Sequence, residues 1–308
     1  MLVVLTGGTG GAKLIQGLSY EVDATDVTIV CNTADDFILH GLYICPDLDT
    51  IMYTLAGMGD DAKGWGISND TFTALEHLER YGCDTWFQLG DKDLATHIAR
   101  TKLVRDGLTL SQVTDQLRRS LGVQATITPM SDDKIQTRVI TDEGELSFQE
   151  FFVRERWAPE VKAVAYSGIE ESRPAPGIIN SILEASGIII CPSNPVTSIG
   201  PILAVPGIRA AIKETNASVI GVSPIIQNAP VSGPAHKLMS AQGSEVSAFG
   251  VAKLYADLLD RLLIATEDEK HAGDIETLGI KAVATSIRMD ALSEKRRMAR
   301  ELLAFIRH

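Results

Sequence analysis

The chain has 308 residues, of which 45% are hydrophobic and 22% are charged, and its formal net charge is -12. This composition is typical of a globular protein, and the length allows one large α/β domain or a domain with a smaller appendage. The negative charge argues against nucleic acid or an anionic membrane as the main partner, although local cations, backbone N–H groups or a metal would still permit an anionic substrate. No apolar run approaches the ~20 residues of a membrane span.

The first residues predict a core strand and not a signal peptide, because residues 1–5 lack a basic leader and run directly into glycines. The cysteines show no CxxC spacing and lie near apolar runs, at Cys31, Cys45, Cys83 and Cys191. Buried free thiols in a reducing compartment are the simplest interpretation. We therefore expect a cytoplasmic protein.

A strand over residues 2–6 is followed by a glycine loop and then by apolar residues at helical spacing. This order aims backbone N–H groups and a helix N-terminus at phosphate. The loop is not a Walker A motif, because Leu14 stands where that motif has Ser or Thr after the lysine. Asn32 stands where a dinucleotide site needs an acid, which disfavours NAD. The predicted phosphate-binding residues are Gly8, Thr9, Gly10, Gly11, Lys13 and, with the nucleotide, Asn32; a tight turn without a ligand is the alternative.

Four aspartates follow the second predicted strand, residues 27–31, at Asp35, Asp36, Asp47 and Asp49. Carboxylates so close together repel one another unless a cation lies among them, and Mg²⁺ takes oxygen ligands and often keeps phosphate as a co-ligand. Pro46 favours an extended or turn backbone, in which side chains two residues apart point the same way. We therefore predict that Asp47 and Asp49 bind Mg²⁺, with a solvated acidic loop as the alternative.

The next segment predicts a helix start at residues 51–55 and helices over residues 69–81, 94–105 and 111–121. Residues 86–89 predict a short strand, and Asp91 and Asp93 follow it directly. Polar residues at the carboxyl end of a strand occupy the ligand-binding position of an open α/β sheet. His97, on the second of these helices, is either a base or a structural hydrogen-bonding residue.

Residues 123 to about 175 predict an inserted α+β subdomain that closes over the site. Strands are expected at residues 125–127 and 134–141, and residues 145–148 are expected to pair with the second of them across a turn. The insertion lies within a single domain that spans residues 1–308.

The C-terminal half predicts a helix over residues 178–185, strands over 187–191 and 218–222, a helix from Pro206, and helices over 246–259 and 292–306. Polar loops follow the two strands. Their candidate nucleobase or phosphate contacts are Ser193, Asn194, Ser198 and Asn228, although Asn beside Pro is also common in turns. Polar loops after at least five strands indicate one composite ligand site on a mainly parallel α/β sheet.

Several of these strings resemble the phospholactate transferases of the CofD/FbiA family. They include Gly7-Gly8-Thr9-Gly10, Asn32-Thr33-Ala34-Asp35-Asp36, Pro46-Asp47-Leu48-Asp49-Thr50, Leu89-Gly90-Asp91-Lys92-Asp93 and Pro192-Ser193-Asn194-Pro195. The strings are long, ordered and spread from residue 6 to about residue 250. The resemblance implies a Rossmann-like, doubly wound fold, a homodimer, and a Mg²⁺-dependent step in the synthesis of coenzyme F-420.

In the implied reaction, a guanosine diphosphate that carries a lactyl or enolpyruvyl group gives its phospho-acid to the terminal ribityl hydroxyl of the deazaflavin Fo, and GMP leaves. Which three-carbon acid the donor carries stays open. Asp47 and Asp49 become the catalytic pair, and Asp49 contacts the ribityl hydroxyl, serves the metal, or does both in turn. The Fo site would also include Gln88, Asp91 and His97. Gln88 replaces a lysine of some members, so its contact would lose charge.

A second branch of the superfamily, the YvcK-like nucleotide-sugar-binding regulators, keeps a similar glycine loop and Asn/Asp loop. The strings around Asp49 and Asp91 are associated with the transferase branch. The transferase is therefore the favoured interpretation, and a regulator without transferase activity is the alternative.

Overall fold

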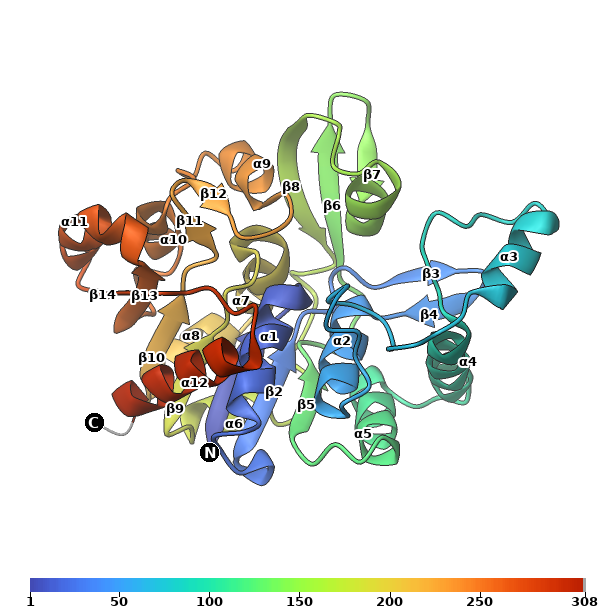
Figure 1. Cartoon of the computed structure of the whole chain (residues 1–308), viewed down its shortest axis with the longest axis horizontal. Helices are drawn as coiled ribbons and strands as arrows, with labels where there is room; N and C mark the ends of the chain where they lie inside the picture. Colours follow the sequence, from blue (N-terminus) through green and yellow to red (C-terminus); the bar gives the residue numbers. More distant parts are fainter. Residues whose placement is uncertain (307–308) are drawn as a thin grey trace.

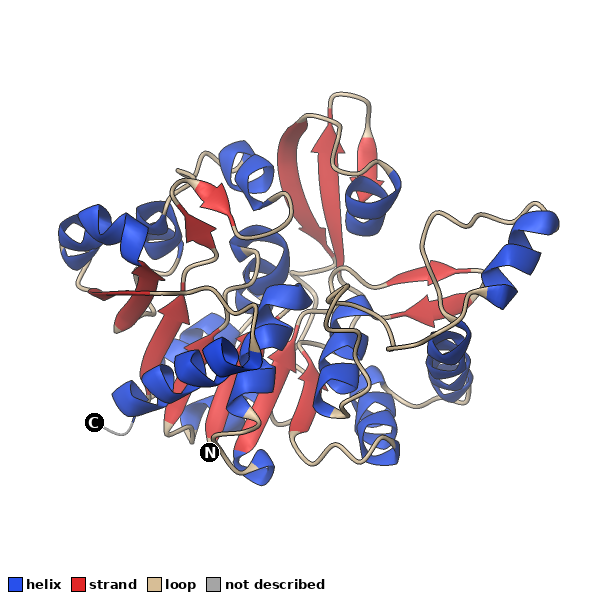
Figure 2. Ribbon diagram, viewed as in Figure 1, coloured by secondary structure: helices blue, strands red, loops and turns tan. Residues whose placement is uncertain are grey.

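A seven-stranded parallel sheet forms the centre of the computed structural model, which describes residues 1–306 (Figures 1 and 2). Numbered in chain order, the strands lie in the spatial order 7-6-5-4-1-2-3, which extends the doubly wound Rossmann order by one strand. The strands are β1 (Leu2–Thr6), β2 (Val27–Cys31), β5 (Thr126–Pro129), β9 (Gly187–Ile190), β10 (Ser218–Val222), β13 (Arg261–Ala265) and β14 (Lys281–Thr285). The expected Rossmann-like α/β fold is confirmed.

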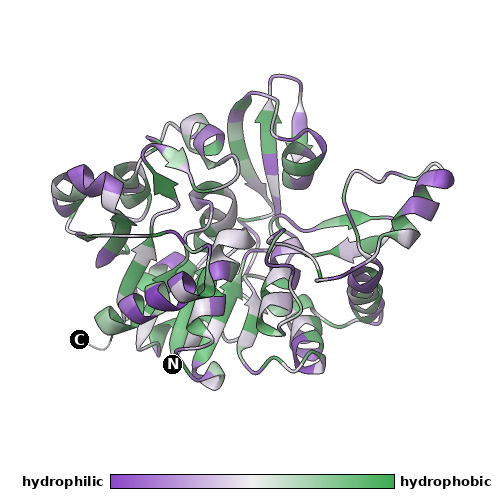
Figure 3. Cartoon of the chain, viewed as in Figure 1, coloured by the Kyte–Doolittle hydropathy of each residue, from purple (hydrophilic) through white to green (hydrophobic). Residues whose placement is uncertain are grey.

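Helices cover both faces of the sheet, which explains why its central strands are continuous apolar runs. Leu2 and Val4 of β1 pack into one core cluster, and Val3 and Leu5 pack into the other. The Leu2 face carries α1 (Gly8–Leu18), α2 (Pro46–Leu55), α5 (Leu110–Ser120) and α12 (Leu292–Ile306). The opposite face carries α6 (Ile178–Leu183), α7 (Gly200–Ala204), α8 (Ile208–Glu214), α9 (Ala235–Ala241), α10 (Ala248–Leu254) and α11 (Ala272–Glu276). Hydrophobic residues accordingly concentrate in the sheet, and hydrophilic residues mark the outer sides of the helices (Figure 3).

A separate antiparallel sheet stands beyond the carboxyl ends of the main strands (Figure 1). It consists of β7 (Glu145–Ser147), β6 (Gln136–Thr141) and β8 (Val161–Ser167), followed after β7 by the π-helix η2 (Glu150–Arg154). This sheet lies within the segment predicted as an insertion, but β5 pairs with β2 in the main sheet, so residues 126–129 belong to the core. Two hydrogen bonds join the inserted segment to the loop that follows β2. Thr137 N donates to Ala34 O at 2.7 Å, and Gln149 Nε2 donates to Asp35 O at 3.4 Å.

An arm projects from the same end of the molecule (Figure 1). It contains the hairpin β3 (Phe37–Leu39) and β4 (Leu42–Ile44), with α3 (Thr73–Arg80) and α4 (Asp91–Arg105) beside it. Two expectations are wrong here. Residues 86–89 form no strand, and residues 46–50, expected to be extended or a turn, form the first part of α2. Pro46 occupies the first turn of that helix, where the missing N–H costs nothing.

The C-terminal half contains three short elements besides the helices already given, η3 (Pro195–Ile199), β11 (Ile225–Ile226) and β12 (Ala229–Pro230), and the 3₁₀ turns are η1 (Ala24–Asp26) and η4 (Thr266–His271). The helix expected from Pro206 begins at Ile208, and the helix expected over residues 246–259 is confined to α10. Within residues 1–306, no single helix has the length and apolar composition to cross a membrane, while Pro195–Ala204 and Ile208–Glu214, a bent pair, pass that test together.

Candidate active site

The glycine loop lies at the point where the strand order of the sheet reverses, between β1 and β9. Open α/β sheets bind ligands in the crevice at this position. Ser193, which follows β9, donates from Oγ to Gly7 O at 2.6 Å and accepts from Gly7 N at 3.3 Å. Ser193 therefore fixes the start of the loop.

The loop is packed too closely for side chains at three of its glycines, among them Gly10, where a Cβ would collide with Pro192 O. A Cβ on Gly7 would lie 2.7 Å from Asp47 Oδ2 and 2.8 Å from Ser198 Cβ. A Cβ on Gly11 would collide with Thr6 Oγ1. Helix α1 begins at Gly8, whose N–H faces the Asp47 carboxylate, and the other N–H groups of its first turn, which lack intrahelical acceptors, are available to an anion. The predicted strand, glycine loop and helix are confirmed as structure, and their phosphate role stays a prediction.

Asn32 joins two of the four clustered aspartates. Its Nδ2 donates to Asp35 Oδ2 and to Asp47 Oδ2, each at 3.0 Å, while its Oδ1 accepts from Ala34 N at 3.0 Å. The side chain of Asn32 is fully buried, so one amide holds both carboxylates in place without supplying positive charge. Asn32 thus shapes the acidic group, which includes Asp35, Asp36 and Asp47.

Within residues 1–306, no lysine, arginine or histidine forms an ion pair with the acidic group, and the Arg100 charge, which counters the rise that burial gives the pKa of Asp36, offsets its negative charge only in part. Asp35, Asp36 and Asp47 are 6%, 7% and 9% exposed. Within residues 1–306, Asp35 Oδ1 and both oxygens of Asp36 have no hydrogen-bond partner. Burial raises the pKa of Asp35 and of Asp36 well above the ordinary value, and it raises the pKa of Asp47 to about 6. Buried carboxylate oxygens without partners are the donor type that a hard cation such as Mg²⁺ takes. The three carboxylates do not all bring an oxygen within 4.8 Å of one another, but Asn32 holds Asp35 and Asp47 as a pair.

Asp49 lies in a different environment on the same helix. Residues two apart on an α-helix are separated by about 200° around its axis, so Asp47 and Asp49 leave α2 in nearly opposite directions. Arg100 binds both oxygens of Asp49: Nη1 donates to Oδ2 at 3.0 Å, and Nη2 pairs with Oδ1. The expectation that the two aspartates point the same way is therefore wrong.

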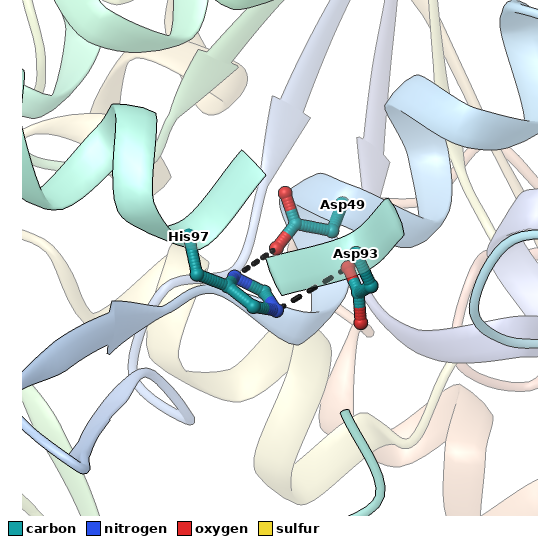
Figure 4. A group of neighbouring side chains, drawn as sticks. All are labelled: Asp49, Asp93 and His97. Atoms are coloured by element: carbon teal, nitrogen blue, oxygen red, sulfur yellow. Dashed lines mark ion pairs between the residues drawn. The ribbon is translucent and has the colours of Figure 1, made fainter. Parts of the chain in front are cut away.

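Asp49, Asp93 and His97 bring three possible metal ligands within 4.8 Å of one another, the one such group among the described residues (Figure 4). His97 Nδ1 lies 3.6 Å from Asp49 Oδ2, and Nε2 lies 3.2 Å from Asp93 Oδ1. However, Arg100 already supplies positive charge here, with Nη1 3.2 Å from His97 Nδ1. Tyr53 Oη also donates to Asp93 Oδ1 at 2.7 Å. Within residues 1–306 His97 Nε2 has no hydrogen-bond partner, but the contacts of Arg100 and Tyr53 make this group better described as a charge-paired network than as a metal site.

The pKa shifts agree with that description. Burial would raise the pKa of Asp93, but the hydrogen bond and charge of His97, with Tyr53 and Arg100, outweigh it and lower the pKa. Burial would lower the pKa of Arg100, but the Asp49 carboxylate outweighs it and raises the pKa. Both shifts favour the charged forms of Asp93 and Arg100.

Residues 2–304 match the family 2-phospho-L-lactate transferase CofD. The chain belongs to this family. It is 44% identical over 308 residues to a Streptomyces griseus protein named phosphoenolpyruvate transferase, covering 98% of this chain and 97% of that protein. It is 41% identical over 298 residues to a Methanosarcina mazei 2-phospho-L-lactate transferase, covering 97% and 98%. The resemblance drawn from the sequence is confirmed.

The fold has a solved counterpart in a UPF0052 family protein from Bacillus halodurans. The TM-score is 0.68 at 16% identity, and 98% of each chain is covered. At this identity the likeness concerns the fold alone. The chain thus shares its α/β architecture with the Bacillus halodurans protein.

Other predicted site residues of this CofD-family chain are placed as follows. Lys13 pairs with Asp290 at 3.1 Å, and its neighbours Thr9 and Gly10 lie in the first turn of α1. Asp91 accepts from Thr71 Oγ1 at 2.6 Å and from the backbone N–H groups of Thr73 and Ala74, so it caps α3. Gln88 is exposed.

The candidate contact residues in the loops after β9 and β10 also differ in whether they lie at the glycine loop. Asn194 Oδ1 accepts from Val196 N at 2.9 Å and Thr197 N at 3.3 Å, which is turn chemistry. Ser198 is buried against Gly7, and Asn228 is exposed with a left-handed φ of 63°. Of these, the structure brings Ser198 to the glycine loop and the acidic group.

Arg100 and Tyr53 were not predicted as site residues, and Asp93 was predicted only as part of a polar cluster after residues 86–89. Asp93, His97 and Arg100 are spaced i, i+4, i+7, which places them on one face of α4. A polar stripe at this spacing was the available signal. Its meaning depends on what the stripe packs against, and the sequence does not show that α2 lies there.

Proposed function

We propose that the chain transfers a phospho-acid, 2-phospholactyl or phosphoenolpyruvyl, from a guanosine diphosphate-linked donor to the terminal ribityl hydroxyl of the deazaflavin Fo. The hydroxyl oxygen forms a bond to the β-phosphorus, the bond from that phosphorus to the bridging oxygen of GMP breaks, and the hydroxyl proton is released. The carrying observation is that the glycine loop meets buried carboxylates without ion-pair partners, among the described residues, at the switch point of the sheet. Relatives named for both phospho-acids support the reaction class.

The donor side is assigned to the glycine loop and the acidic group. The N–H groups at the start of α1 would bind diphosphate oxygens, because a helix N-terminus favours anions. Asp35 and Asp47, held together by Asn32, would hold Mg²⁺, which would offset charge on the diphosphate and on the leaving GMP. This assignment retains Asp47 of the predicted metal pair and replaces Asp49 with Asp35.

The acceptor side is assigned to Asp49. Its charge is already matched by Arg100, so it needs no metal, and its carboxylate can accept a hydrogen bond from a hydroxyl. Gln88 and His97 complete the proposed Fo site. His97 is 1% exposed and sits behind Asp49, so its proposed part is to hold Asp49 and not to act as a base.

The test is a mass-spectrometric assay with Fo, Mg²⁺ and, in parallel, the lactyl and enolpyruvyl diphosphoguanosine donors. We expect GMP together with a deazaflavin that is heavier by one phospho-acid, and we expect a chelator to stop its formation. The faster donor identifies the acid. If neither donor gives product while GDP still binds, the chain is a nucleotide-binding regulator and the proposal fails.

A further inference from the structure

Helix α4 buries charge where a helix ordinarily buries apolar side chains. Asp93, His97 and Arg100 lie on one face and are 8%, 1% and 1% exposed. Removing charged groups from water is costly, and well-packed apolar residues of similar size often stabilise a fold equally well or better. The charged face is therefore hard to explain by stability alone, which directs attention to what it contacts.

The contacts of this face converge on Asp49. Arg100 engages both of its carboxylate oxygens, and Nη1 also donates to Tyr43 O at 3.3 Å. His97 lies beside the same carboxylate, with Nδ1 3.6 Å from Asp49 Oδ2, and its Nε2 lies 3.2 Å from Asp93 Oδ1. A fork of two parallel donors fixes the plane of a carboxylate as well as its position. Each oxygen still has a lone pair for one further donor.

The hydrogen bonds of Arg100 lie outside the donor side, although its charge acts on Asp36 and partly offsets the rise that burial gives the pKa of that carboxyl. Within the described part of the chain, Arg100 makes no hydrogen bond or ion pair with Asp47, Asn32 or the glycine loop. Those residues are joined to one another through Asn32 and Gly7. A change at Arg100 should therefore act on one of the two substrates.

We propose that Arg100, supported by His97, is a positioning residue for the alcohol acceptor: it orients Asp49 so that the carboxylate receives the hydrogen bond of the attacking hydroxyl. This inference rests on the proposed function and adds a residue to it. In this role Arg100 acts through Asp49 and touches neither phosphate nor metal.

The experiment compares Arg100→Met, which removes the charge at similar length, with Arg100→Lys, which keeps the charge but loses the fork. For Arg100→Met we expect kcat/KM for Fo to fall about 100-fold, the cost of a misplaced reacting group. GDP affinity, measured by calorimetry with Mg²⁺ present, should stay unchanged. Arg100→Lys should recover part of the loss. Unchanged kinetics with Fo, or an equal loss of GDP affinity, would overturn the proposal.

A double-mutant cycle tests whether Arg100 acts through Asp49. If it does, Asp49→Asn/Arg100→Met should be no slower than Asp49→Asn alone; if the two losses multiply, the inference is wrong. The double variant removes both buried charges together, so it also serves if Arg100→Met alone does not fold. In that case Arg100→Lys takes its place in the kinetic comparison.

Arg118→Met is the matched control. Arg118 is also a buried arginine, 8% exposed, which pairs with Asp115 and donates to Val123 O at 3.1 Å, but it belongs to α5. Its loss should lower stability and leave kcat/KM for Fo unchanged; a fall equal to that of Arg100→Met would count against positioning. Wild-type protein that makes no product refutes the proposed function itself, whereas active wild type with an unaffected Arg100→Met refutes only this inference.

Discussion

Helix α2 sends two carboxylates, two residues apart, into opposite electrostatic environments. Asp49 meets a guanidinium and an imidazole, and its charge is balanced within the fold. Asp47 meets the amide of Asn32 and the backbone of the glycine loop, beside two further buried carboxylates. The charge on the Asp49 side of the helix is balanced within the fold, and under the proposed assignment a bound cation would balance the charge on the Asp47 side.

The comparison also separates the two substrates of the proposed reaction. A negatively charged diphosphate can bind beside three carboxylates only if it brings a metal with it. An uncharged alcohol needs no metal, but it needs an acceptor with a fixed direction. The unbalanced side therefore suits the donor, and the balanced side suits the acceptor.

The largest expected effect comes from removing the charge of Asp47, on the side of α2 where the carboxylates have no ion-pair partner among the described residues. Asp47→Asn should lower kcat roughly a thousandfold, because a lost metal contact removes several kcal/mol of transition-state stabilisation. The melting temperature should not fall, since a buried carboxylate without a cation is replaced by a neutral isostere. Single-turnover assays at saturating Mg²⁺ and thermal melts check both statements. A variant that keeps more than a tenth of wild-type activity would contradict the metal assignment.

The second effect is on stability and depends on pH. The folded pKa of Asp47 is about 6, against an ordinary value of 3.8, so the folded state binds this proton more tightly than the unfolded state. The corresponding stability is present below about pH 4 and is lost as pH rises through about 6, by about 3 kcal/mol of unfolding free energy.

Urea unfolding of wild type and Asp47→Asn without divalent metal, at pH values from 4 to 8, measures this loss. The variant should lack it, so its advantage over wild type should grow between pH 4 and pH 7. Mg²⁺ at pH 7 should restore wild-type stability, because metal binds the ionised carboxylate. A difference between the two proteins that does not change with pH would show that Asp47 carries no such penalty.

Much of the fold could be predicted because its central strands are apolar runs ended by polar loops. The predicted bounds agree with the observed ones to within one residue for four strands, β1, β2, β9 and β10. Helix α12 matches its predicted range. β13 was missed because its short apolar run follows a predicted helix, and periodicity does not separate a buried strand from more helix. The composition of residues 86–89 predicts a strand, but these residues form an irregular aromatic segment instead. The rings of Phe37 and Trp86 stack there, with their centroids 5.7 Å apart.

The candidate site was predictable in composition and not in geometry. The glycine loop, Asn32 and the aspartates were recognised from their residue types. Pro46 misled the interpretation, since proline suits both a turn and the first turn of a helix. That one choice decides whether Asp47 and Asp49 share a side. Arg100 lies 51 residues from Asp49 in sequence, so only tertiary structure reveals the pair.

The smallest expected effect tests whether the proposed Fo site extends from Asp49 to the first turn of α4. Asp91 begins α4, the helix that supplies Arg100, yet its contacts go to Thr71 and the first N–H groups of α3. Asp91→Ala should therefore give a small fall in melting temperature and faster amide exchange in α3, with kcat/KM for Fo nearly unchanged. Asp23→Ala is the matched control, because Asp23 caps η1 through Thr25 far from α2 in the chain. If Asp91→Ala slows the reaction with Fo as much as Asp49→Asn while Asp23→Ala does not, the acceptor site extends to the first turn of α4, as the resemblance implied.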